Sequence, residues 1–158
     1  MFNGTRIDDL LASYVSLLLR NLVPPSSNLH RTREVGSLPR VTQILVIEDD
    51  RDIRNLIRQV LGDEGYDLTF VDGLDRAPAD LAPDLVIMDL VGLRPYEGGL
   101  ARASVRGVSL RYPTTPIIVC TAHEPALKEL DRLGAADVLP KPFNIEMLLL
   151  TVARLIAQ

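Results

Sequence analysis

The stretch QILVIEDDRDIR, residues 43–54, joins an apolar run to three consecutive carboxylates and then to a charged helical pattern. The run at residues 44–47 is uniformly aliphatic, as is typical of a strand buried on both faces of a parallel sheet. The apolar residues that follow recur at the spacing of one helix face. They are Ile53, Leu56, Ile57, Val60 and Leu61. The stretch therefore predicts a βα unit with an acidic turn.

Four further apolar runs follow, at residues 68–71, 85–88, 117–120 and 136–139. Helical patterns occupy residues 52–61, 99–110, 125–133 and 144–157. The segment at residues 72–83 is short and contains prolines, so it has room for only a turn or two of helix. Alternating strands and helices of this length predict an α/β fold in which five parallel strands form an open, doubly wound sheet.

The composition indicates an ordinary globular chain without a membrane span or a nucleic-acid-binding face. The 158 residues carry a net charge of -4, which does not suggest direct DNA binding. No apolar run reaches the roughly 20 residues that cross a bilayer, and Asp8 and Asp9 precede the early apolar stretch where a signal peptide would carry positive charge. The single cysteine, Cys120, excludes an internal disulfide. We expect a cytoplasmic protein.

The first 40 residues differ from the rest of the chain. Residues 1–22 contain an apolar stripe at helical spacing, made of Ile7, Leu10, Leu11, Tyr14, Leu17 and Leu18. Residues 23–40 carry three prolines and read as a linker, so the compact domain is predicted at residues 41–158. Such an apolar helix must bury its face on its own domain, on a second copy or on another partner. We favour a homodimer through residues 7–22; the alternative is a frayed or non-native leader.

Polar residues follow four of the five predicted strands. Glu48 and Asp49 come after the first, Asp89 after the third, Thr121 after the fourth and Lys141 after the fifth. Ligands of open α/β sheets bind beyond these carboxyl ends. Crowded carboxylates repel each other, and a hard cation such as Mg²⁺, which also suits a phosphoryl group, relieves that repulsion.

Each of these residues also has an ordinary interpretation. The acids at residues 48–50 could cap a helix, where Asp50 suits the helix dipole. Asp89 and Thr121 could be turn or cap residues, and Lys141 a solvated lysine. Their joint occurrence at four separate strand ends favours the metal and phosphate interpretation.

Four stretches carry a resemblance to a known family: ILVIEDDRDIR, PDLVIMDL, PIIVCTA and GAADVLPKPF, at residues 44–54, 83–90, 116–122 and 134–143. In this order and spacing, residues 41–158 resemble the receiver domain of bacterial two-component response regulators, which has a flavodoxin-like fold. The resemblance implies that Asp89 is the phosphoacceptor and that Thr121 and Lys141 bind the phosphoryl group. It implies Mg²⁺ ligands from three side chains and one backbone carbonyl: Glu48, Asp49, Asp89 and Val91.

The implied function is phosphoryl transfer to Asp89 from a phosphohistidine on a sensor histidine kinase or histidine phosphotransfer protein. The chain would signal by protein contact or as a phosphorelay intermediate, and not as an enzyme beyond its own phosphorylation and dephosphorylation. It departs from the family pattern in a longer loop after Asp89, a shortened second helix, Pro125 at the start of the fourth, and Val138 in place of a switch aromatic. A phosphorylation-independent pseudo-receiver is therefore the alternative, and a Mg²⁺-dependent aspartyl-phosphate phosphohydrolase is the third candidate.

Overall fold

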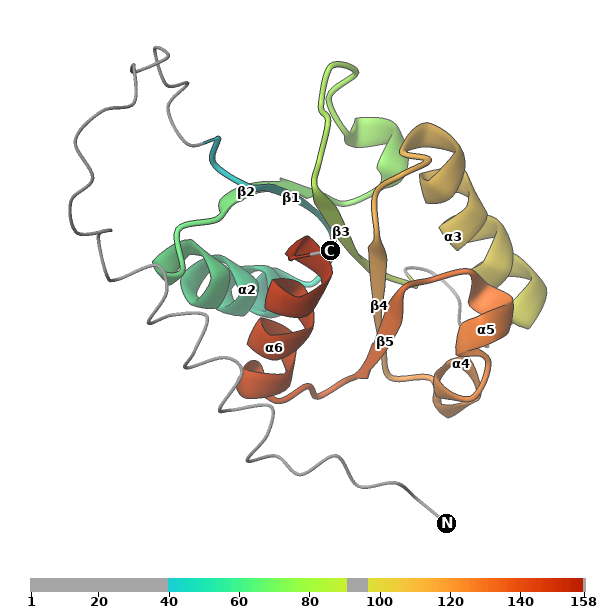
Figure 1. Cartoon of the computed structure of the whole chain (residues 1–158). Helices are drawn as coiled ribbons and strands as arrows, with labels where there is room; N and C mark the ends of the chain where they lie inside the picture. Colours follow the sequence, from blue (N-terminus) through green and yellow to red (C-terminus); the bar gives the residue numbers. More distant parts are fainter. Residues whose placement is uncertain (1–39, 91–96, 158) are drawn as a thin grey trace, which may run out of the picture. The chain divides into compact units, whose positions relative to one another are not determined.

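A computed structural model describes residues 40–90 and 97–157. Arg40–Gln158 forms a compact unit of its own. Five parallel strands form one sheet in the order β2-β1-β3-β4-β5 (Figure 1). The strands are β1 (Gln43–Ile47), β2 (Asp67–Val71), β3 (Leu85–Asp89), β4 (Ile117–Thr121) and β5 (Asp137–Pro140). The predicted fold class is confirmed. The helix predicted for residues 1–22, and the linker up to residue 39, lie outside the described residues.

Helices cover both faces of the sheet (Figure 1). They are α2 (Arg51–Asp63), α3 (Gly98–Arg111), α4 (Glu124–Leu127), α5 (Leu130–Leu133) and α6 (Ile145–Ile156), with a single 3₁₀ turn, η1 (Leu74–Arg76). The short second helix is confirmed by η1. The prediction of one helix over residues 125–133 was wrong. The backbone N–H groups of Lys128 and Glu129 bond three residues back instead of four, which interrupts the α-helical ladder between α4 and α5.

The uniform apolar runs are explained by burial on both sides. In β1, Leu45 and Ile47 belong to a core cluster under α3, α4 and α5, while Ile44 and Val46 belong to a second cluster under α2 and α6. Because successive side chains of a strand point to opposite faces, both sets must be apolar when helices cover both faces. The alternation of polar and apolar residues that marks a solvent-facing sheet is therefore missing from the sequence.

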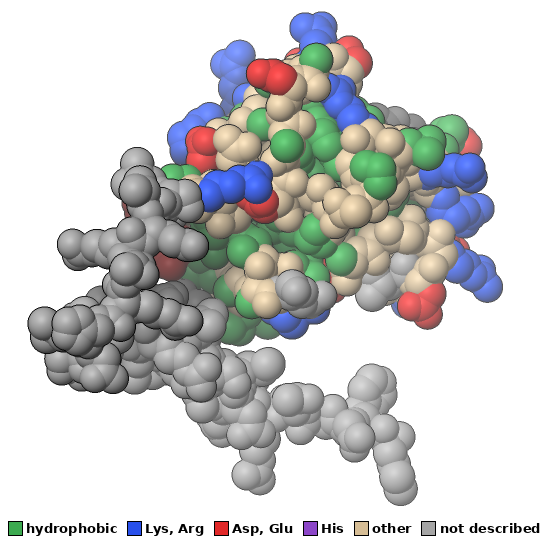
Figure 2. Space-filling view, turned by 45° about the horizontal axis from the view of Figure 1, so that its top comes forward, with side chains coloured by type: hydrophobic (Ala, Val, Ile, Leu, Met, Phe, Trp, Pro, Cys, Tyr) green, Lys and Arg blue, Asp and Glu red, His purple; other side chains and the backbone are tan. Residues whose placement is uncertain are grey.

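Charged side chains of both signs share the surface. On the face shown in Figure 2, Lys and Arg side chains are scattered among acidic and neutral ones without forming one continuous basic patch. Among the helices in the described part of the chain, none has the length and apolar content that crossing a bilayer requires.

Arg111, at the end of α3, holds the connection between β2 and β3 in place. Its guanidinium donates to the carbonyl oxygens of Leu74 (2.8 Å), Ala77 (2.8 Å) and Pro78 (2.9 Å). The Leu74 and Pro78 carbonyls also accept from the backbone N–H groups of Ala77 (3.2 Å) and Leu81 (3.3 Å). The planar fork of the arginine adds a donor to each of the three carbonyls at once. Arg111 thus ties the short connection between β2 and β3 to the end of α3.

Arg111→Ala is expected to lower the free energy of unfolding by about 2 kcal/mol, because hydrogen bonds to a charged donor are lost while the site stays partly solvated. Urea denaturation measures this loss. The matched control is Arg106→Ala, an exposed arginine on the same helix, which should change stability by less than about 0.5 kcal/mol. Equal stabilities of the two variants would contradict the role of Arg111.

Candidate functional site

The strand order brings the predicted site residues together. β1, β3, β4 and β5 are consecutive neighbours in the sheet. The carboxyl ends of these parallel strands therefore bring together Glu48, Asp89, Thr121 and Lys141. β2, at the outer edge beside β1, contributes no residue to the predicted site. The four site residues can lie close together only if their strands are neighbours in the sheet. The sequence pattern alone does not establish this strand order.

Glu48, Asp49 and Asp89 form an acidic cluster. One carboxylate oxygen from each lies within 4.8 Å of those of the other two. Glu48 is only 2% exposed, Asp89 is partly buried, and Asp49 is exposed. Three oxygen donors of like charge, open to solvent on one side, suit a hard divalent cation that keeps some of its water. The donor set therefore fits Mg²⁺.

Lys141 lies within hydrogen-bond distance of two of these acids. Its Nζ is 2.6 Å from Glu48 Oε2 and 3.1 Å from Asp89 Oδ2, and its side chain is 12% exposed. The backbone of Lys141 is also bonded to the neighbouring strand. Its backbone N–H donates to the Thr121 carbonyl at 2.8 Å, and the following peptide bond to Pro142 is cis.

For both Glu48 and Lys141, burial and the neighbouring charges shift the pKa in opposite directions. Burial raises the pKa of Glu48 above its ordinary value, although the Lys141 hydrogen bond and charge oppose that shift. Burial alone would lower the pKa of Lys141, but the hydrogen bond to Glu48 and the charges of Asp89 and Glu48 raise it. Lys141 therefore remains an ammonium at neutral pH, and it supplies positive charge inside the acidic cluster.

The third acid of the turn has a different role. Asp50 is the N-cap of α2, and its Oδ1 accepts from the backbone N–H groups of Asp52 (2.8 Å) and Ile53 (3.1 Å). The Asp50 N–H donates to Glu48 Oε1 at 3.2 Å. The interpretation of Asp50 as the helix's N-terminal acid is confirmed. Because Asp50 caps the helix, the turn presents Glu48 and Asp49 to the site.

Thr121 and Cys120 end β4 inside the domain. Thr121 is fully buried, and its Oγ1 accepts from the backbone N–H of His123 at 3.1 Å, which fixes the hydroxyl oxygen. Cys120 is buried, and burial raises the pKa of its thiol to about 12. The thiol is therefore protonated at neutral pH and packs as an apolar group.

One predicted ligand of the site is not described by the structure, and one contact in the site was not predicted. The predicted carbonyl ligand, Val91, lies outside the described residues. The direct ion pair between Lys141 and Glu48 was missed, because the resemblance assigned Lys141 only to the phosphoryl group on Asp89. The signal was present, since a glutamate reaches one methylene further than an aspartate at the same position. Val138, which stands at the aromatic position, is partly buried and packs against the core cluster under α3, α4 and α5.

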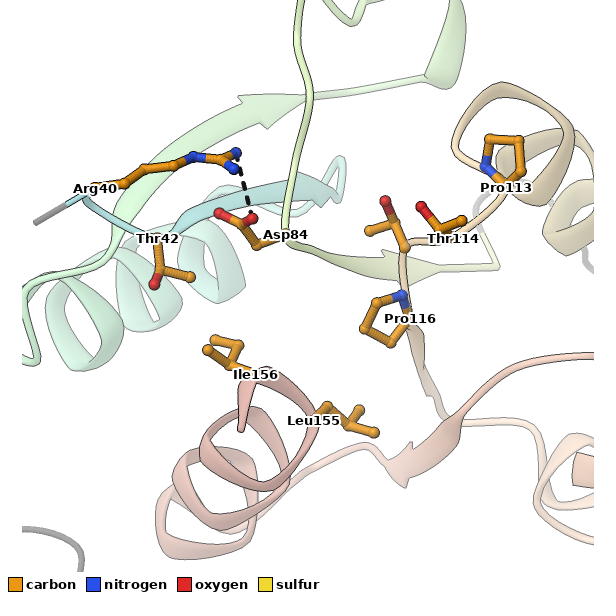
Figure 3. Close-up of a pocket in the computed structure, with 9 residues that line it drawn as sticks. Arg40, Thr42, Asp84, Pro113, Thr114, Pro116, Leu155 and Ile156 are labelled. Carbon is orange, nitrogen blue, oxygen red and sulfur yellow. Dashed lines mark ion pairs between the residues drawn. The ribbon is translucent and has the colours of Figure 1, made fainter. Parts of the chain in front are cut away.

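A cavity of about 560 Å³ lies away from this cluster, at the amino ends of the strands (Figure 3). Thr42, Asp84 and Pro116 precede β1, β3 and β4 there, and Leu155 and Ile156 of α6 form an apolar wall. Its charged groups already have partners. Arg40 pairs with Asp84 at 3.3 Å, and the other Asp84 oxygen accepts from a backbone N–H at 2.8 Å. The acidic cluster is thus the better candidate for chemistry.

An open parallel sheet with acids, a hydroxyl and a lysine at the carboxyl ends of its strands belongs to the class of α/β domains that bind ligands at that end. A model of the family "Response regulator receiver domain" matches residues 44–153. The chain belongs to the response regulator receiver family, the receiver domains of two-component systems.

Individual relatives agree with this assignment. The chain is 32% identical over 117 residues to the putative response regulator NtrX-like of Rickettsia bellii, covering 70% of this chain and 24% of that protein. It is 34% identical over 113 residues to response regulator MprA of Mycobacterium tuberculosis, covering 68% and 47%. Among solved structures, chemotaxis response regulator CheY4 of Vibrio cholerae matches with a TM-score of 0.58 at 28% identity, covering 73% of this chain and 99% of that one. The chain spans less than half the length of these two curated relatives.

Proposed function

We propose that the chain accepts a phosphoryl group on Asp89 from a phosphohistidine of a sensor histidine kinase or histidine phosphotransfer protein, with Mg²⁺ as cofactor. The observation that carries this proposal is the position of Asp89. Its Oδ2 lies 3.1 Å from the Lys141 ammonium, and one of its oxygens lies within 4.8 Å of those of Glu48 and Asp49. A carboxylate between a fixed cation and a cation-binding acid pair is placed for transfer of an anionic group.

In the transfer, a carboxylate oxygen of Asp89 attacks phosphorus while the bond from phosphorus to the donor imidazole nitrogen breaks. The Lys141 ammonium stabilises the charge that gathers on the phosphoryl oxygens, and the Thr121 hydroxyl donates a hydrogen bond to one of them. Mg²⁺, held by Glu48, Asp49, Asp89 and the Val91 carbonyl, would supply further charge neutralisation. Water later hydrolyses the acyl phosphate, which returns the carboxylate of Asp89.

The output is proposed to be a protein contact or onward phosphorelay in the cytoplasm. The curated relatives include a DNA-binding transcriptional regulator, NtrC of Escherichia coli, but this chain spans only 24% of its length. We expect no direct DNA binding by residues 41–158. Val138 has an aliphatic side chain in the position of a switch aromatic, so phosphorylation must act through other elements. That feature favours a pseudo-receiver as the second candidate.

Intact mass spectrometry after incubation with acetyl phosphate, with and without Mg²⁺, tests the proposal. A phosphoryl acceptor gains one phosphoryl group, and gains it faster with Mg²⁺. A pseudo-receiver stays at its original mass under both conditions. Mg²⁺-independent labelling would remove the metal from the proposal while leaving the acceptor in place.

The N-terminal region is proposed to be a dimerisation helix at residues 1–22 with a linker at 23–40, joined to the receiver domain at residues 41–158. The apolar stripe at residues 7–22 is too apolar to remain in water, and an extended linker of this length spans roughly 60 Å, enough to reach a second subunit.

Deleting residues 1–39 is expected to convert a dimer to a monomer, with Mg²⁺ binding unchanged. Light scattering measures the mass, and calorimetric titration measures Mg²⁺ binding. The matched variant Leu10→Asp/Leu17→Asp in the full chain places charge on the same stripe and should have the same effect on mass. An unchanged oligomeric state in both variants would contradict the dimer.

A further inference from the structure

Apolar side chains lie exposed along the outer face of α3. Leu100 is 50% exposed and Leu110 is 72% exposed, and within the described part of the chain no other large hydrophobic side chain is as exposed as Leu110. The opposite face of the helix is buried against the core through Ala101, Val105 and Val108. The two leucines therefore belong to a second, solvent-facing side of α3 and not to the core of the domain.

Four residues of this outer face have a regular spacing. They form what we call the α3 stripe: Leu100, Ala103, Gly107 and Leu110. Their separations of three, four and three residues are those of the a and d positions of a coiled coil. Ala103 is exposed and Gly107 is half-buried. A Cβ at Gly107 would lie 3.7 Å from Leu74 Cδ2, so Leu74 of η1 continues the apolar surface there.

The short connection between β2 and β3 leaves this face of α3 open. A full helix in that connection would have room to lie alongside α3, but the connection contains only the single turn η1. Figure 1 shows η1 beside the carboxyl end of α3, to which Arg111 ties it. Ser104 and Arg106, which flank the α3 stripe, are exposed to solvent. The middle of the stripe is therefore accessible to another helix.

The α3 stripe has the same pattern of large and small residues in both directions from Val105. When two copies of α3 pack antiparallel about a two-fold axis at that residue, Leu100 of each copy faces Leu110 of the other, and Ala103 faces Gly107. A two-fold interface requires this self-complementarity, because every contact occurs twice with the roles exchanged. The small residues at the centre let the two helix axes approach closely.

We propose that the α3 stripe is a self-association surface, on which the α3 stripe of a second copy of this chain packs antiparallel. The inference goes beyond the phosphoacceptor role and does not depend on it. A single helix pair is smaller than the roughly 1,200 Å² of a stable specific interface. The contact is therefore weak by itself, and it forms when high concentration or another contact brings two chains together.

Cross-linking of the full chain tests this arrangement. Ser104→Cys places a reactive thiol beside the stripe and next to the two-fold axis, whereas the native Cys120 is buried. A bismaleimide with a short spacer should join two chains at position 104. The matched control is Gln59→Cys, an exposed position on α2, which covers the opposite face of the sheet. The control should give about tenfold less cross-linked product, because only a specific interface holds two thiols together.

A second substitution tests whether the stripe itself makes the contact. Leu110→Asp, added to Ser104→Cys, places a charge in the interface twice, so cross-linking should fall about tenfold or more. Because Leu110 is 72% exposed, the variant should fold as the parent does, which circular dichroism checks. Arg106→Ala should act in the opposite direction. In the antiparallel pair the two Arg106 side chains lie on the same side near the axis, so removing their repulsion should raise cross-linking about twofold.

The outcomes separate the possible occupants of the stripe. Equal cross-linking at positions 104 and 59, or cross-linking that survives Leu110→Asp, would refute the self-association surface. A lower yield with Arg106→Ala would contradict the antiparallel arrangement. A cross-link at position 104 that forms only in the Leu10→Asp/Leu17→Asp background would mean that the N-terminal stripe, and not a second copy of α3, covers this face. None of these results depends on phosphorylation of Asp89, so the two proposals fail separately.

Discussion

Asp89→Asn abolishes phosphorylation of the chain by acetyl phosphate and by any phosphohistidine donor; this is the largest effect that we expect. Asparagine keeps the size and shape of the side chain but offers a neutral amide, which is a far weaker nucleophile than a carboxylate and cannot form an acyl phosphate in the same way. Lys141 keeps its contact with Glu48, so the fold should remain within about 1 kcal/mol of the wild type.

The matched control for this experiment is Asp52→Asn, an exposed acid at the start of α2. It should accept one phosphoryl group as the wild type does. Intact mass and phosphate-sensitive gels measure the result, and circular dichroism confirms that both variants fold. A phosphoryl group on the Asp89→Asn protein would place the acceptor elsewhere.

Asp49→Ala is expected to weaken Mg²⁺ binding by roughly 100-fold or more, because even groups that only orient metal ligands contribute 10- to 100-fold. Asp49 is exposed, so its removal leaves no buried group unpaired, and relief of repulsion with Glu48 and Asp89 should keep the apo fold at least as stable. Titration calorimetry measures the affinity, and urea denaturation without metal measures the stability.

The control is Asp50→Ala, which changes the neighbouring acid of the same turn. It should lower the stability of the fold and leave Mg²⁺ binding largely unchanged. Loss of this N-cap should lower the free energy of unfolding by about 1 kcal/mol, with a much smaller change in Mg²⁺ affinity. Equal Mg²⁺ affinities for wild type and Asp49→Ala would refute the metal site. Similar losses of Mg²⁺ affinity in both variants would show that the turn as a whole, and not Asp49, controls binding.

The sequence predicted the parts of this domain that depend on local patterns. Buried strands need continuous aliphatic residues, and the helices that cover them need an apolar stripe, so the strand at residues 44–47 and the helix that follows it are visible without a structure. The sequence also showed which strands are followed by polar residues, because the end of each apolar run marks the end of its strand.

Local patterns were less informative where particular hydrogen bonds decide the length of a helix or the position of a loop. Residues 125–133 carry a helical pattern, but the bonds at Lys128 and Glu129 divide it into α4 and α5. The support of the β2–β3 connection by Arg111 joins residues more than 30 positions apart, and no periodicity indicates such a contact.

By itself, then, the sequence determined the α/β class, the number of strands and the kinds of side chain at their ends, because these depend on spacing along the chain. Only the tertiary structure decided that β1, β3, β4 and β5 are neighbours, and hence that Lys141 reaches both Glu48 and Asp89. The physical reason is that strand order and side-chain reach are set by packing between segments far apart in sequence. Glu48 and Lys141 are 93 positions apart in the sequence, so no local pattern indicates the ion pair that joins them at 2.6 Å.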